Sequence, residues 1–208
     1  PFYKEAQQLA NDFAVTSPLL ANTVPAADIA MLHSYDNRWS IDAQRHHRDF
    51  EVVAHFHNYY RSLAARNIAT DILSVDTPLD GYKLVIAPTL LMLNETRAAQ
   101  LKAFVENGGH LVLTIRSGMK DDYSALLPMR QPGMLADIAG VEVEDYYALL
   151  DPVPVVGEGF SGESRLWAER LKVRDEAGTK VIARYGEANG WLDGQAAITS
   201  HPYGKGSV

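Results

Sequence analysis

The side chains of this sequence that could carry out chemistry are a loop serine, a row of histidines and two groups of carboxylates. Ser117 follows the apolar stretch of "HLVLTIRSG", where a hydrolase would hold its nucleophile. The G-x-S-x-G pattern of such a nucleophile is absent, because Ile115 and Arg116 precede the serine. We therefore expect Ser117 to be a solvated loop residue. A hydrolase that pairs it with His33 or His110 is the rival interpretation.

The histidines in question are His47 and His55, which together with Glu51 between them are spaced four residues apart and would share one face of a helix. A helix rises about 1.5 Å per residue, so the two outer side chains would lie about 12 Å apart. Three ligands in a line do not converge on one ion, and we predict a polar exposed face instead. We predict no metal and no cofactor for this chain.

The carboxylates form two groups, Asp121-Asp122 and the trio Glu142, Glu144 and Asp145. Acid–base catalysis requires two carboxyl groups whose environments give them different pKa values. Both groups lie in polar, loop-like or alternating segments, which favour solvated carboxylates. We therefore predict that the chain contains no catalytic residue and is not an enzyme by itself.

Composition excludes several classes of protein. The 208 residues include no cysteine, which rules out disulfides, a thiolate nucleophile and zinc sites built on cysteine. The net charge of -7, without basic clusters, excludes a nucleic-acid footprint. No apolar run approaches the roughly 18 residues of a membrane span, and the first residues do not resemble a signal peptide. We expect the cytoplasm, with the periplasm as the alternative.

Apolar segments and helical periodicity alternate over the first 120 residues. Strands are expected at 24–34, 69–74, 82–88 and 110–117, and helices at 1–14, 46–66 and 94–107. Residues 35–44 are expected to form a loop. Such alternation predicts a doubly wound α/β domain with a mostly parallel sheet and right-handed crossovers.

The pattern changes from about residue 128. A short helix is expected within "LPMRQPGMLADIAG", followed by strands near 141–150, 165–173, 180–186 and 195–204. "RDEAGTK" (174–180) is typical of a hairpin turn, so we predict an antiparallel C-terminal extension. Glycine-rich phosphate-binding patterns are absent from the sequence, which argues against a nucleotide site.

Aromatic residues give a different signal at the carboxyl end of the first expected strand. In open α/β sheets ligands bind outside these strand ends, which here include "HSYDNRWS" (33–40). Trp39 lies beside Arg38 and Asp36, and exposed Trp and Arg are enriched at protein contacts and at sugar-stacking sites. A tryptophan that caps the core is the alternative interpretation.

Four stretches carry a resemblance to a known family. They are "ADIAMLHSYDNRWS", the long block "YKLVIAPTLLMLNETRAAQLKAFVENGGHLVLTIRSGMKDD", and "QPGMLADIAGVEVEDYY" together with the closing "HPYGKGSV". On these stretches, which are distributed along most of the chain, it resembles the trimerisation domain of glycoside hydrolase family 42 β-galactosidases. In that family the domain follows a catalytic (β/α)8 barrel that holds both catalytic glutamates.

The resemblance implies a flavodoxin-like sheet of the class I glutamine amidotransferase type, here without its cysteine nucleophile. It implies that residues 1–23 are a linker helix from the barrel and that 24–208 are the trimerisation domain, whose last strand would continue past Val208. It further implies a homotrimer in which the domain contacts a barrel and helps to wall the galactoside pocket of a neighbouring subunit. Tyr35, Asp36, Arg38 and Trp39 are the candidates for that wall or subunit contact. A sugar-binding sensor and a degenerate amidotransferase-like hydrolase are the alternatives.

Overall fold

Short strands from the first half of the chain and from its last residues form a mostly parallel sheet. The computed structural model describes residues 2–24 and 26–208. The strands of this sheet are β1 (Ile29–His33), β2 (Thr70–Ser74), β3 (Leu84–Ala87), β4 (His110–Leu113), β11 (Pro202–Tyr203) and β12 (Gly206–Ser207). Their spatial order is β11-β12-β4-β3-β1-β2, and only β11 runs antiparallel to its neighbour. The predicted α/β class with a mostly parallel sheet is thus confirmed.

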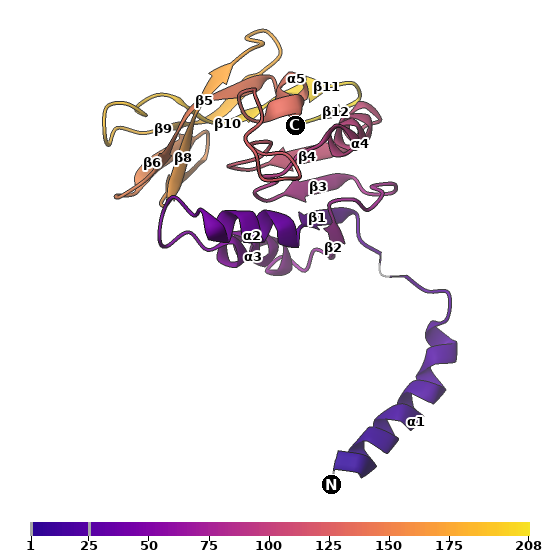
Figure 1. Cartoon of the computed structure of the whole chain (residues 1–208). Helices are drawn as coiled ribbons and strands as arrows, with labels where there is room; N and C mark the ends of the chain where they lie inside the picture. Colours follow the sequence, from indigo (N-terminus) through magenta and orange to yellow (C-terminus); the bar gives the residue numbers. More distant parts are fainter. Residues whose placement is uncertain (1, 25) are drawn as a thin grey trace.

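The helices are α1 (Phe2–Leu20), α2 (Tyr35–Ala43), α3 (Val52–Ala64), α4 (Glu95–Glu106) and α5 (Ala136–Ala139), with a 3-10 turn at Gly133–Leu135. Helix α4 confirms its predicted start, because the Asn94 side chain accepts a hydrogen bond from the backbone N–H of Arg97 at 2.8 Å. Leu101 and Val105 of α4 pack into the main core against β3 and β4. Helix α1 extends away from the rest of the chain and buries none of its described residues (Figure 1).

Two predictions for the segment between β1 and α3 are wrong. Residues 35–43 form helix α2 instead of a loop, because the Ser34 hydroxyl accepts the N–H of Asn37 and caps the helix directly after β1. The helix predicted at 46–66 begins only at Val52. His47 therefore lies outside α3, and the shared helical face of His47, Glu51 and His55 does not exist.

A second, antiparallel sheet confirms the predicted extension. Its strands are β5 (Val141–Ala148), β6 (Val153–Gly157), β7 (Phe160–Ser164), β8 (Trp167–Val173), β9 (Lys180–Tyr185) and β10 (Ala196–Ser200). Their order is β5-β8-β10-β9-β6-β7. The expected hairpin at "RDEAGTK" is wrong, because β10 lies between β8 and β9. The hairpin formed by β6 and β7, which contains glycines and exposed polar residues, was not predicted.

Arg116 joins the two sheets from the loop after β4. Its guanidinium is fully buried, donates to the carbonyls of Gln44 and Arg45 at 3.1 Å each, and lies 4.9 Å from the ring centre of Trp167. The carboxylate of Glu169 accepts hydrogen bonds from the backbone N–H of Arg116 (2.7 Å) and from the Trp167 indole (3.0 Å). A buried polar junction therefore fixes the antiparallel sheet to the parallel one.

Within the described part of the chain, no helix combines the length and the apolar character needed to cross a membrane.

Candidate functional site

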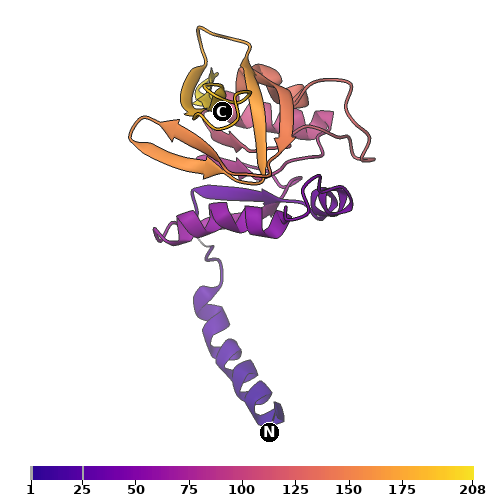
Figure 2. The same cartoon turned by 90° about the vertical axis from the view of Figure 1, so that its left-hand side faces the viewer.

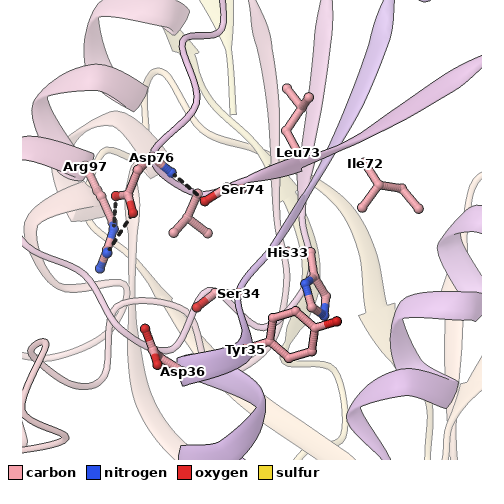
Figure 3. Close-up of a pocket in the computed structure, with 10 residues that line it drawn as sticks. His33, Ser34, Tyr35, Asp36, Ile72, Leu73, Ser74, Asp76 and Arg97 are labelled. Atoms are coloured by element: carbon pink, nitrogen blue, oxygen red, sulfur yellow. Dashed lines mark hydrogen bonds and ion pairs between the residues drawn. The ribbon is translucent and has the colours of Figure 1, made fainter.

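An open cleft of about 380 Å³ lies at the carboxyl ends of β1 and β2 (Figure 3). It is lined by His33, Ser34, Tyr35 and Asp36 from the β1–α2 junction, by residues 72–76 from the end of β2, and by Arg97 of α4. The end of β1 and the capped start of α2 supply one wall, so the backbone holds this wall in place without help from a mobile loop. Figure 3 shows the Tyr35 ring beside His33, and Asp36 on the side of the cleft that holds Asp76 and Arg97.

Arg97 is the cation of the cleft, and two carboxylates share it. Its Nε donates to Asp76 Oδ1 at 2.8 Å, and its Nη1 donates to Asp122 Oδ1 at 2.5 Å. The hydrogen bond to Asp76 raises the pKa of Arg97. A hydrogen bond from Asn94, with help from Arg97, lowers the pKa of Asp122. The charge of Arg97 is thereby matched inside the protein, which makes the cleft a poor site for a phosphate or another strong anion.

The place where an α/β sheet usually binds its ligand is filled here. The strand order reverses between β1 and β3, and crevices at such reversals are the common ligand sites of open α/β sheets. The buried side chain of Asn37 occupies this position and accepts the backbone N–H of Met92 at 2.9 Å. Thr89, which follows β3 at φ +45°, is buried, and its backbone N–H donates to the Thr114 hydroxyl. The chain's own side chains therefore close the crevice, and Thr89 is not presented to solvent as a nucleophile.

The four predicted site residues all lie on α2, but they do not form one cluster. Tyr35 and Trp39 are 60% and 63% exposed, with ring centres 5.8 Å apart. They make one aromatic face, because residues four apart on a helix are neighbours. Asp36 points into the cleft, whereas Arg38 pairs with Asp42 at 3.6 Å and is not one of the residues that line it.

His33 is a functional group that the site prediction left out. Its ring meets the edge of Tyr35 at 4.9 Å between centres and lines the cleft. Partial burial, and secondarily the charge of Arg38, lowers the pKa of His33. The imidazole is therefore neutral near pH 7 and offers one hydrogen-bond donor and one acceptor to a ligand.

The rival serine-hydrolase arrangement is not formed. Ser117 is buried, contrary to its prediction as a solvated residue, because its hydroxyl turns inward and donates to the carbonyl of Thr114 at 2.7 Å. His110 lies at the other end of β4, where its Nδ1 contacts the Ser207 hydroxyl at 2.8 Å. Among the residues described by the structure, no group of three or more His, Asp or Glu side chains is arranged to hold a metal ion.

Comparison with known proteins identifies the family. The model of a family described as "Beta-galactosidase trimerisation domain" matches residues 27–208. The chain belongs to this trimerisation domain family. The matched family is the assembly module of these glycoside hydrolases and not their catalytic domain.

Several β-galactosidases match this trimerisation domain over nearly its whole length. The chain is 36% identical to beta-galactosidase BglY of Alicyclobacillus acidocaldarius over 91% of its residues, which correspond to 28% of that protein. It superposes on the crystal structure of a β-galactosidase from Bacillus circulans sp. alkalophilus with a TM-score of 0.87 at 25% identity, covering 99% of this chain and 31% of that one. The haloarchaeal enzyme of Halorubrum lacusprofundi gives 0.84 at 29% identity, over 90% of this chain and 28% of that enzyme. The chain thus spans under a third of the length of each of these three relatives.

Proposed function

We propose that this chain is the non-catalytic oligomerisation domain of a β-galactosidase, which fixes a homotrimer and helps to wall the galactoside pocket of a neighbouring subunit. The exposed aromatic pair Tyr35–Trp39, held on a capped helix beside an open cleft, is the observation that carries this proposal. Large aromatic side chains held rigidly at a surface are typical anchors of protein contacts and of sugar stacking. The filled crevice supports a role in assembly over a reaction of the chain's own.

The proposed layout assigns residues 1–23 to a linker from a catalytic barrel and residues 24–208 to the assembly domain. Helix α1 supports this layout, because it exposes Phe2, Leu9 and Phe13 and buries no described residue of its own. An apolar helix surface of this kind is stable in water only marginally and suits contact with another domain. The strand order β2-β1-β3-β4 supports a flavodoxin-like, amidotransferase-like scaffold. We place the protein in the cytoplasm.

Light scattering over a concentration series tests the assembly proposal directly. We expect a species near three times the 22.9 kDa chain mass. In the β-galactosidase that carries this domain, Trp39→Ala should raise the KM for a galactoside or weaken the trimer, and it should leave the domain folded. Asp42→Asn is the matched control, because Asp42 lies on the same helix, pairs with Arg38 and Arg45, and is not one of the candidate contact residues. Unchanged KM and unchanged mass for Trp39→Ala would remove α2 from the pocket and from the interface.

A second candidate function is binding of a monosaccharide in the cleft itself. Its polar lining favours this candidate: a neutral imidazole from His33, the Asp36 carboxylate, and the exposed face of Tyr35. Sugars are recognised by such hydroxyl-binding groups beside an aromatic face. Calorimetric titration of the chain with galactose tests it, and Asp36→Asn should weaken any binding. Absence of heat at millimolar galactose would exclude this candidate.

A further inference from the structure

Two Asn-Gly pairs occur in this chain, and the fold surrounds them differently. They are Asn107-Gly108, at the end of α4, and Asn189-Gly190, in the loop 186–195 between β9 and β10. In such a pair the backbone nitrogen of the glycine can attack the side-chain amide of the asparagine, because glycine has no side chain that blocks a close approach. The local structure therefore decides which of the two pairs reacts.

Asn107 is held as the C-terminal cap of α4. Its Nδ2 donates to the carbonyl of Ala103 at 2.9 Å, and the N–H of Gly108 donates to the carbonyl of Val105 at 3.0 Å. Because ψ of Asn107 is 0°, the nitrogen of Gly108 eclipses the backbone nitrogen of Asn107 and is turned away from its side chain. The leaving group and the attacking nitrogen are thus both bound in the helix end, and the attack is blocked while α4 is folded.

Asn189 lies outside helices and strands and has different partners. Its Oδ1 accepts the N–H of Leu192 at 3.2 Å. This N–H withdraws electron density from the side-chain carbonyl, as a donor of an oxyanion hole does. Among the residues that the structure describes, none accepts a hydrogen bond from Nδ2 of Asn189, so the leaving nitrogen is not held in place.

The carboxylate of Asp193 lies at the attacking nitrogen. It accepts the N–H of Ala188 at 3.0 Å and that of Asn189 at 3.2 Å, and the N–H of Gly190 also donates to it. A carboxylate within hydrogen-bond reach of the proton that must leave is placed to act as a general base. The loop 186–195 therefore brings together a nucleophile, a polarised carbonyl and a base.

We infer that Asn189-Gly190 is a site of spontaneous modification, at which the folded chain converts its own asparagine into aspartate and isoaspartate. The Gly190 nitrogen forms a bond to Cγ of Asn189 and gives its proton to Asp193. The bond between Cγ and Nδ2 breaks, and Nδ2 leaves as ammonia with that proton, which closes a succinimide. Water then adds to one carbonyl of the succinimide and opens it to aspartate or to isoaspartate. No other reactant takes part, and no atom is oxidised or reduced.

The modification should loosen the cover of the antiparallel sheet. Leu192 is fully buried in a cluster with Leu149 and Tyr185, and the rings of Trp191 and Tyr147 have centres 3.7 Å apart. Isoaspartate lengthens the backbone shortly before Trp191 and Leu192, and a close-packed cluster does not absorb such a shift without rearrangement. Figure 2 shows this sheet at the end of the molecule opposite α1, so a change here leaves the proposed linker helix untouched.

Tryptic peptide mapping of the aged chain tests the inference. Trypsin places the two pairs in separate peptides, 103–116 and 185–205, each of which contains a single asparagine. We expect the peptide 185–205 of the folded chain to gain the mass of deamidation at least about tenfold faster than the peptide 103–116. In guanidinium chloride, where neither pair keeps its surroundings, the two rates should agree within about threefold. Equal rates in the folded chain, or faster conversion at Asn107, overturn the inference.

Two substitutions in the loop separate the role of the base from that of charge. Asp193→Ser keeps an oxygen that accepts backbone N–H groups but removes the carboxylate, and it should slow the conversion of Asn189 at least about tenfold. Glu187→Gln removes one negative charge from the same loop and should leave the rate unchanged. Circular dichroism checks the fold of both variants. An Asp193→Ser chain that is folded and converts Asn189 at the wild-type rate overturns the assigned reaction.

Discussion

Acid should destabilise this chain through one histidine of α3. Burial lowers the pKa of His55 to about 4, from an ordinary value of about 6.5. Its ring packs against Phe50 and Tyr59, with centres 5.6 and 5.2 Å apart, and its Nε2 lies 3.5 Å from the Thr114 hydroxyl. The folded chain therefore keeps this imidazole neutral at pH values where the unfolded chain binds a proton.

The direction and magnitude of the change in the free energy of unfolding follow from the linkage between protonation and folding. Since the pKa is lower in the folded state, the contribution of His55 is present above pH 6.5 and is lost as the pH falls toward 4. Between pH 7 and pH 5 this loss amounts to about 2 kcal/mol of the free energy of unfolding. For a chain of this length the melting temperature should fall by roughly 4–8 °C from this group.

Urea unfolding at pH 7 and pH 5, followed by tryptophan fluorescence, measures the effect. The wild-type chain should lose about 2 kcal/mol more than His55→Gln over this interval. His57→Gln is the control, because His57 is exposed on the same helix and should behave as the wild type. His33 and His46, whose pKa values are also lowered by partial burial, remain in all three proteins and cancel in the comparison. Equal losses for wild type and His55→Gln would refute the reasoning.

Three further substitutions test the internal architecture by urea unfolding. Arg116→Met should cost about 3 kcal/mol at pH 7, because it removes the guanidinium hydrogen bonds to the carbonyls of Gln44 and Arg45 and the positive charge near the buried Glu169 carboxylate. Burial raises the pKa of Glu169, so this cost should shrink as the pH falls and the carboxyl is protonated; a constant cost would contradict the junction. Asn37→Ala should cost about 1–3 kcal/mol, since the buried N–H of Met92 loses its acceptor; no change would mean that water replaces it. Gly118→Ala should cost at least about 2 kcal/mol, because φ is +64° and the added Cβ would lie 2.2 Å from the carbonyl oxygen of Pro132; wild-type stability would show that the loop yields.

The parts of the fold that sequence revealed are those whose signal is local. The apolar runs around Met31 and Val85 and the cap at Asn94 follow from residue types within a few positions. Helix α2 has only Asn37 and Ile41 as buried residues, so hydrophobic periodicity gave no sign of it. The local sequence sign of this helix was Ser34, because a serine directly after a buried strand is a common helix N-cap.

The residues proposed for the candidate site were also chosen from local signals. Tyr35 and Trp39 were chosen by residue type and by their position after β1, and the structure places Tyr35 and Asp36 in the lining of the cleft. The closing of the crevice by Asn37, and the junction of Arg116 with Glu169, depend on residues 55 and 53 positions apart. A single sequence carries no signal for such long-range pairs, because each partner looks like an ordinary surface residue in its own neighbourhood.

The pairing of β12 with β4 has a consequence for the order of folding. Ser207 pairs with His110, and the six strands of the antiparallel sheet lie between these two residues in the chain. As the polypeptide is made from its N-terminus, β1 to β4 can pair early, but one edge of β4 stays open until the whole antiparallel sheet has emerged. An open edge of this kind is a template for pairing with other chains. Premature arrest of synthesis within residues 141–200 should therefore yield aggregation more readily than arrest after residue 208.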